Sequence, residues 1–485
     1  MKAFLSVRTS LRVFMQVVCL FGLVFLPVVM VSFVYGEPLW FVYLVFSLTL
    51  TSLSWFFAQS LAFSHDLTQR QGFALLVFIW FGLGFVSGIP FVLGMDIAWI
   101  DAFFAGISGI TTTGAEVFPD LSILPMSLRF YRMWLQFIGG LGVVVLTLAL
   151  FPFLGITHMH HMRSDLPGPN KSAVLPGKLS DLASVLWGIY LGLWLFCVGG
   201  LWWAGLDLFA AICESFSIVS TGGYGLHTGN LGYYQKPAVY AVSAFFMIVS
   251  SLNFGLHYQV VYGGGWSVYF RDSEARTYLT CMFFLPLSIL GLLWWGMPSF
   301  FEVGEVVFTT VSLMTSSGQQ ITHHLGWPVW LVFSWIILGV IGGTSGSTAG
   351  GIKWARVQFF FQELTNSLAI LHHPRAVLPK GTGVEQLHGP ASVNQVLLRS
   401  FLFAFLIFFL LGLVLCLWLG LDFATAFSSV SACISNTGVG FFGVQSGFSS
   451  LSVGVKWVML FLMLVGRIEL LALMVVLSPS YWRTQ

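Results

Sequence analysis

A short glycine motif returns four times along this chain, and each copy closes an apolar run too short to cross a bilayer. Each copy consists of a small hydroxyl or amide residue, a Thr or Ser, and then Gly. The motif recurs about every hundred residues, which indicates an internal repeat and constrains the fold more than any single segment does. The four copies are Thr112-Thr113-Gly114, Ser220-Thr221-Gly222, Ser316-Ser317-Gly318 and Asn436-Thr437-Gly438.

The segments around the motifs are apolar enough to lie in lipid. Hydrophobic residues make up 57% of the chain and charged residues 8%, whereas a soluble domain carries about 25% charged residues. A spanning helix needs about 20 apolar residues, and that length predicts an N-terminal hairpin followed by two spans in each of four repeats. The predicted spans cover residues 13–34 and 39–63, then 73–92 and 128–154, 182–204 and 238–262, 278–296 and 329–341, and 396–419 and 455–477.

The run before each glycine motif, about 10 to 14 residues long, predicts a re-entrant segment rather than a span. Such backbone survives at membrane depth only where it is buried in protein or lines a cavity. We therefore predict an all-α membrane protein in which four span–re-entrant pore half-helix–span repeats surround one pore, next to an N-terminal transmembrane hairpin. The predicted units are the hairpin at 1–70, pore repeats at 71–162 and 163–272, a third repeat with a gate loop at 273–380, and a fourth repeat at 381–485.

The distribution of charge sets an orientation. With a cytoplasmic N-terminus, most basic residues fall on the inner side, as the positive-inside rule requires, and both termini are then cytoplasmic. The same orientation places most acids outside, where a negative mouth attracts cations, although a solvated outer face is the simpler alternative. An acid at the start of a short run suits the positive end of a helix dipole. The acids at the four run starts are Asp101, Asp207, Glu302 and Asp422.

The glycine motifs have the chemistry of a cation filter. A cation that leaves water needs oxygen ligands, and a ring of backbone carbonyls can supply them. Glycine permits the unusual backbone of such a ring because it lacks a Cβ, and the neighbouring hydroxyls add further oxygens. The alternative is four turns that only pack. Oxygen ligands are expected from Thr112, Thr113, Ser220, Thr221, Ser316, Ser317, Asn436 and Thr437.

A glycine-rich stretch at residues 342–351 interrupts the second span of repeat three. Each glycine costs about 1 kcal/mol of helix stability relative to alanine, so the helix should break inside the membrane. A nucleotide-binding loop is excluded because Trp354 follows the lysine and a helix precedes the stretch. The residues of the predicted loop are Gly342, Gly343, Thr344, Ser345, Gly346, Ser347, Thr348, Gly350 and Gly351, with Lys353 after them at the cytoplasmic mouth.

Arg467 lies inside the last predicted span. An arginine in a membrane is costly and as a rule pairs with another polar group. We expect its side chain to point at the pore and to donate to carbonyls of the 342–351 loop. Snorkelling to the inner surface is the alternative.

Several stretches together resemble a known family. They are T-T-T-G-A at 111–115, S-T-G-G-Y at 220–224 with His227 after it, G-G-T-S-G-S-T-A-G-G-I-K at 342–353, H-P-R-A-V at 373–377, N-T-G-V-G at 436–440 and G-R-I-E at 466–469. On these motifs the chain resembles the Trk/Ktr potassium transporter superfamily, and TrkH-type pore-forming subunits in particular. One position departs from the pattern, since Gln319 follows Gly318 where an apolar residue is expected.

The resemblance implies potassium uptake across a bacterial inner membrane. The four loops would form the selectivity filter, and Arg467 and the 342–351 loop would close the path beneath it. A homodimer and a cytoplasmic nucleotide-binding regulatory subunit of the TrkA type are implied as partners. Potassium is then the transported ion, and no organic cofactor, nucleic acid or enzymatic activity is expected. A sodium- or proton-coupled potassium symporter is the alternative, and the histidines at 158–161 are predicted to belong to a linker.

Overall fold

The computed structural model of the chain describes residues 2–61, 69–150, 179–296, 303–321, 326–372, 391–468 and 470–482. Helices dominate these residues and none of them lies in a strand, as the predicted all-α class requires. Six of the described helices are long and apolar enough to cross a membrane alone, and two further pairs qualify as bent units. The chain is therefore a multi-pass membrane protein. Glu302, the histidines at 158–161 and the motif at 373–377 lie outside the described residues.

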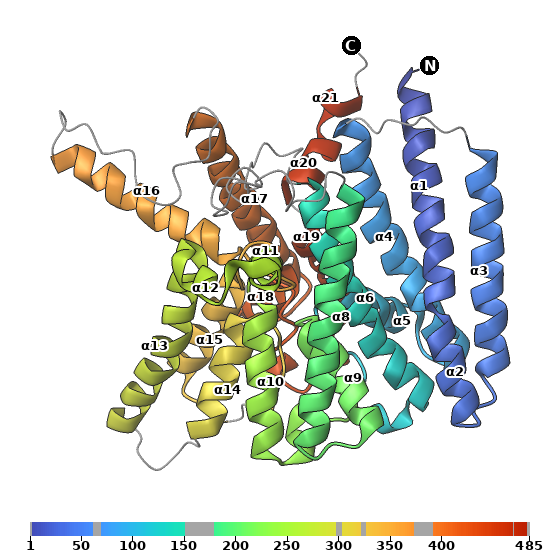
Figure 1. The fold of residues 1–485 in the computed structure, drawn as a ribbon, viewed down its shortest axis with the longest axis horizontal. Coiled ribbons are helices and arrows are strands. Elements are labelled where there is room, and N and C mark those ends of the chain that lie inside the picture. Colours follow the sequence, from blue (N-terminus) through green and yellow to red (C-terminus); the bar gives the residue numbers. More distant parts are fainter. Residues whose placement is uncertain are drawn as a thin grey trace.

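The chain begins with a helical hairpin that packs on the first repeat. α1 (Lys2–Val24) and α2 (Leu26–Val34) are separated at Phe25, and Pro27 in the first turn of α2 removes a helical N–H donor there. α3 (Trp40–Ser60) returns beside them. Figure 1 shows this hairpin at one edge of the bundle, where α1 also contacts α4. Apart from the break at Phe25, the hairpin agrees with the spans predicted at 13–34 and 39–63.

Four copies of span, half-helix and span follow. Each half-helix has twelve residues, which at 1.5 Å per residue is about 18 Å and well short of the roughly 30 Å hydrocarbon core. The copies are α4 (Gln69–Gly94), α5 (Trp99–Ile110) and α6 (Met126–Leu150); α8 (Leu179–Trp203), α9 (Leu208–Val219) and α10 (Pro237–Ser250); α13 (Ser273–Gly296), α14 (Val303–Met314) and α15 (Val329–Ile341); and α17 (Ala391–Trp418), α18 (Phe423–Ile434) and α19 (Val453–Arg467).

The half-helices form a closed ring with the second spans between them. α6 contacts α5 and α9, α10 contacts α9 and α14, and α15 contacts α14 and α18. α19 contacts α18 and then α5 again, so the fourth repeat closes the ring onto the first. Each second span is therefore shared by two neighbouring repeats. This is the predicted four-repeat architecture.

Shorter elements join and extend these helices. In Figure 1, α16 projects away from the bundle, and α21 lies at the same end of the molecule as the start of α1, so the described chain starts and ends on one side. The shorter elements are α11 (Phe254–Gln259), α12 (Ser267–Arg271), α16 (Trp354–His372), α20 (Leu470–Leu477), α21 (Pro479–Trp482), and the turns Leu121–Ile123, Asn230–Tyr234, Val260–Gly264 and Phe442–Val444.

Three of the four second spans are interrupted, whereas α6 is continuous. α10 and α11 meet at a bend of 91°, α15 and α16 are separated by the glycine-rich loop, and α19 ends at Arg467 before α20. The prediction of continuous spans at 238–262 and 455–477 is therefore wrong. In repeat two the break has a local cause, because the Asn253 side chain accepts the N–H of Gly255 at 2.7 Å and starts α11 as a new helix.

Candidate functional site

All four half-helices end in the same turn, and in each turn a residue other than glycine has a positive φ. In the first, the N–H of Thr112 bonds the carbonyl of Gly109, and the N–H of Thr113 reaches back five residues to the carbonyl of Ser108. This pair of bonds is a Schellman ending. Such residues rarely adopt a positive φ, so four equivalent cases indicate a backbone held for function. The four residues are Thr112 (φ 51°), Thr221 (φ 52°), Ser316 (φ 46°) and Asn436 (φ 54°).

Two residues later, each turn carries a glycine that touches the neighbouring loop. We call them the filter glycines after the selectivity filter predicted from the sequence: Gly114, Gly223, Gly318 and Gly438, all with positive φ. A Cβ on any of them would collide with a carbonyl oxygen of the next loop. The pairs, with the glycine first, are Gly114 with Gly222, Gly223 with Ser317, Gly318 with Thr437, and Gly438 with Thr113. The four loops therefore pack main chain against main chain, in chain order, as a closed ring.

The filter glycine of repeat two comes one residue later than the sequence motif suggests. Ser220-Thr221-Gly222 matches the other motifs by composition, but the positive φ values fall on Thr221 and Gly223. Because α9 ends at Val219, Ser220 caps the helix and occupies the place that Thr111 has in repeat one. The predicted register of this loop is therefore corrected by one residue. A similar residue composition in the four motifs does not determine at which residue each half-helix ends.

The four filter glycines line one cavity of about 100 Å³. Glu116, His227 and Asn230, from the segments after the first and second loops, also line it. Within the described part of the chain, two buried hydroxyl oxygens of the loops have no hydrogen-bond partner: Oγ1 of Thr112 and Oγ of Ser317. Buried polar atoms are nearly always satisfied, so these oxygens are suited to bind a cation or its water.

The acids that begin the short runs act mainly on the helices. Asp207 and Asp422 cap α9 and α18, each accepting a main-chain N–H at 3.0 Å, and this bond holds the pKa of Asp422 below its usual value. Asp101 pairs instead with Lys456 at 2.7 Å. Of the residues that the structure describes, Glu116 is the only carboxylate on the cavity wall. On the cavity wall the predicted negative mouth is represented by one acid, and the contribution of the other outer acids stays a prediction.

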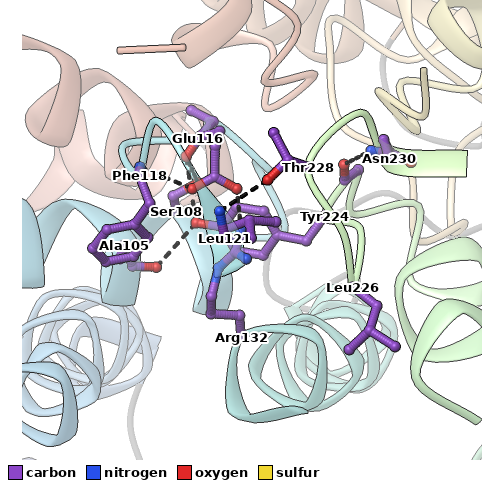
Figure 2. Close-up of polar contacts among 12 residues, drawn as sticks. Ala105, Ser108, Glu116, Phe118, Leu121, Arg132, Tyr224, Leu226, Thr228 and Asn230 are labelled. Atoms are coloured by element: carbon purple, nitrogen blue, oxygen red, sulfur yellow. Dashed lines mark hydrogen bonds and ion pairs between the residues drawn. The ribbon is translucent and has the colours of Figure 1, made fainter. Parts of the chain in front are cut away.

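A buried arginine holds Glu116 from behind. Figure 2 shows Arg132 reaching from α6 toward the Glu116 carboxylate, with which it forms an ion pair, and toward Tyr224. Its guanidinium carbon lies 4.2 Å from the centroid of the Tyr224 ring, within cation–π range. The Tyr224 hydroxyl in turn donates to the carbonyl of Ala105 at 3.2 Å. Arg132 therefore compensates the charge of Glu116 and joins the first and second loops behind the filter.

The 342–351 loop lies on the opposite side of the ring from the cavity. The cavity is lined by residues that follow the filter glycines, whereas this loop contacts residues that precede them. Thr348 Oγ1 donates to the carbonyl of Val219 at 3.3 Å, and the N–H of Gly350 donates to Ser316 Oγ at 2.7 Å. A Cβ on Gly350 would collide with the carbonyl oxygen of Ser435. The loop thus touches the second, third and fourth filter segments at once.

Two basic side chains hold this loop. Arg467 is 8% exposed and donates from Nη1 to the carbonyl of Thr348 at 3.1 Å, so it does not snorkel to the surface. Lys353 has a φ of 78° and donates from Nζ to the carbonyls of Ala349 at 2.7 Å and Ser347 at 3.3 Å. The ammonium group of Lys353 therefore binds the loop itself. The sequence-based prediction places this lysine only at the cytoplasmic mouth.

Three polar residues of this site, two of them fully buried, are missing from the sequence-based prediction. Glu274, at the start of α13, accepts the N–H of Ser345 in the loop at 2.6 Å and that of Ala355 at the start of α16 at 3.1 Å, and so joins the loop to the helix that follows it. Arg132 and Gln136 lie one turn apart in α6. Polar residues inside a span are rare and usually functional, and that signal identifies the latter two. Glu274 adjoins a charged segment between two repeats and carries no such signal.

The fold and the ring define a class of protein: a multi-pass membrane protein whose four repeats surround one axis. A family model described as TrkH, cation transport protein, matches residues 40–298 and 297–484. The chain belongs to this family, whose members are transport proteins and not enzymes.

Named relatives cover most of the chain. The Trk system potassium uptake protein TrkH of Escherichia coli (strain K12) is 34% identical over 423 residues, 86% of this chain and 87% of the relative. The protein of the same name from Vibrio parahaemolyticus is 33% identical over 487 residues, 98% of this chain and 99% of the relative. The crystal structure of the potassium transporter TrkH from Vibrio parahaemolyticus matches with a TM-score of 0.88 and 30% identity, over 98% of this chain and 99% of that one.

Proposed function

We propose that potassium ions cross the membrane through the ring of four filter loops. The closed contact of each filter glycine with the next loop carries the proposal, because it places the ends of four half-helices around one axis. An ion that leaves its water shell at this ring is bound by hydroxyl and carbonyl oxygens. The relatives are named as potassium uptake proteins. The proposed filter residues are Thr112, Thr113, Gly114, Thr221, Gly222, Gly223, Ser316, Ser317, Gly318, Asn436, Thr437 and Gly438.

The loop at 342–351 is the proposed gate. It lies against three filter segments on the side away from the cavity, in the way of an ion that has passed the ring. Arg467 adds a positive charge at the same depth, which opposes a cation as long as its hydrogen bond to Thr348 lasts. Opening then requires the loop to leave Arg467, Lys353 and Glu274.

The proposed driving force is the membrane potential, about 2.3 kcal/mol per charge per 100 mV. Symport needs a second site for sodium or a proton. Glu116, the one acid on the cavity wall in the described chain, is ion-paired with Arg132 and is a poor candidate for that site. Passive uptake is therefore proposed in preference to coupled symport.

The proposed setting is a bacterial inner membrane, with both termini in the cytoplasm. The start of α1 and α21 lie at one end of the molecule, which suits termini on a single side (Figure 1). A homodimer with a TrkA-type nucleotide-binding regulatory subunit is proposed on the family resemblance. Such a partner would supply the nucleotide-dependent control of the gate.

Rubidium uptake into vesicles reconstituted with the purified protein tests the function. We expect uptake that follows an imposed potential, is competed by potassium and needs no sodium or proton gradient. Uptake at zero potential that requires a sodium or proton gradient would instead establish symport. Protein that carries no rubidium or potassium under either condition would refute the proposed function.

A further inference from the structure

The second filter loop lacks a side chain that its neighbours have. The position after the positive-φ residue is Thr113, Ser317 and Thr437 in the other repeats, but Gly222 in repeat two. In the first loop the hydroxyl of Thr113 lies 2.7 Å from that of Thr111 and ties the loop to its own helix end. Gly222 forms no bond of this kind because it has no side chain. The second loop therefore has no side chain at this position that could hold it, and in the third loop the hydroxyl of Ser317 makes no such bond either.

Gln136 of α6 occupies the space beside Gly222. Its Nε2 donates to the Gly222 carbonyl at 2.6 Å, and its Oε1 accepts the N–H of Tyr224 at 3.3 Å. One fully buried amide thus holds the peptide groups on both sides of the filter glycine Gly223. A Cβ on Gly222 would collide with that amide. The absence of a side chain at position 222 therefore makes room for the amide of Gln136.

Gln319 reaches the same loop from the third filter segment. It is 2% exposed, and its Nε2 donates to Ser217 Oγ at 2.9 Å and approaches the Tyr224 carbonyl at 3.4 Å. Together the two glutamines bond the N–H and the C=O of Tyr224, whose ring packs under Arg132 (Figure 2). An apolar residue at position 319 would remove both of these contacts and leave Asn230, whose Nδ2 donates to the Gly223 carbonyl at 2.7 Å.

We propose that Gln136 and Gln319 are positioning residues for ion discrimination, because they fix the second filter loop within the ring. This inference rests on the proposed potassium pathway. Selectivity depends on where the oxygens of a filter stand, and each loop packs directly on the next, so a displaced second loop moves its neighbours. In the described chain the carbonyls of Thr113, Ser317 and Thr437 accept no side-chain hydrogen bond, whereas that of Gly222 does. A side-chain bond to the carbonyl before the filter glycine is therefore specific to repeat two, whereas the carbonyl after it also accepts a side-chain hydroxyl in repeats one and three, from Ser108 and Ser312.

The test is rubidium uptake into vesicles containing the full-length protein, with potassium or sodium as competitor. Gln136→Leu and Gln319→Leu each remove one bracing amide. Gln358→Leu is the matched control, because that amide bonds Ser273 Oγ at 3.0 Å, away from the filter. We expect the ratio of half-inhibitory sodium to potassium concentrations to fall on the order of five-fold in each bracing variant, the size of one buried hydrogen bond. The control should keep the ratio of the unmodified protein.

An unchanged ratio in both bracing variants overturns this inference and leaves the proposed function standing. No rubidium uptake by the unmodified protein overturns the proposed function and this inference with it. If a leucine variant does not assemble, Gln136→Met and Gln319→Met keep the length of the side chain without its amide. The extra thermal stability that potassium gives over sodium then reports the same discrimination without transport, and an unchanged difference would count against the proposal.

Discussion

Replacing Gly318 by alanine tests the closed ring most directly. At its φ of 69° a Cβ costs about 1–2 kcal/mol, and this Cβ would also collide with the carbonyl oxygen of Thr437. Relieving such an overlap in a packed interior costs about 1–3 kcal/mol. We therefore expect Gly318→Ala to lower the free energy of unfolding by about 2–5 kcal/mol and to abolish most rubidium uptake, since the fourth loop has to move.

Alanine substitutions at two other glycines separate the backbone cost of a positive φ from the steric cost of the overlap with Thr437. Gly420 has a φ of 92°, and a Cβ added there would meet no atom within 4 Å, so Gly420→Ala should cost only the backbone part, about 1–2 kcal/mol, and keep uptake. Gly142, inside α6 and equally open, should gain up to about 1 kcal/mol as alanine. Thermal unfolding in detergent and vesicle uptake measure both effects. If Gly318→Ala behaves like Gly420→Ala in stability and flux, the loops do not touch as described.

Three further variants test the gate and the outer ion pair. Arg467→Gln removes a charge-assisted bond of about 1.5–3 kcal/mol to the gate loop, so basal rubidium flux should rise on the order of ten-fold, and unchanged flux would exclude a gating role. Glu274→Gln weakens one bond to the loop at Ser345 and one to the start of α16 at Ala355, so it should raise basal flux with unaltered ion preference; a changed preference in uptake competition would argue against this position in the gate. Asp101→Asn leaves the buried Lys456 unpaired and should destabilise by about 1–3 kcal/mol, less than a fully buried pair because Asp101 is partly exposed. Thermal unfolding of Asp101→Asn in a Lys456→Met background should recover part of that loss, and no recovery would show that the two charges are not coupled.

Much of the fold was predictable because lipid makes segment length informative. α15 (Val329–Ile341) has its predicted bounds, since Gly342 ends the helix where the sequence turns glycine-rich. The residues between α10 and α11 include no glycine or proline, and the bend depends on the Asn253 side chain, which caps the new helix by accepting the N–H of Gly255. The length of an apolar segment indicates whether it could span the membrane, but not whether it forms one straight helix.

The candidate site was predictable only where its parts are local. The hydroxyl-glycine motifs and Arg467 stand out in the sequence, but the register of the second loop depends on where α9 ends. Gln136 lies 86 positions from Gly222, its hydrogen-bond partner, and a single sequence holds no record of such a pairing. Glu274 is likewise an ordinary acid until the loop at Ser345 folds onto it. The missed contacts join residues far apart in the sequence, between repeats for Gln136 and within repeat three for Glu274.

Closure of the ring by the last repeat orders the assembly of the pore. The Asn436 side chain bonds the hydroxyl of Thr113, 323 positions earlier, at 2.8 Å, and Gly438 packs on the same segment. During synthesis the first filter segment therefore lacks its contacts with the fourth until nearly the whole polypeptide has been inserted. A chain cut short before α18 would keep three half-helices and most of its membrane anchorage, yet have no enclosed conduit for an ion.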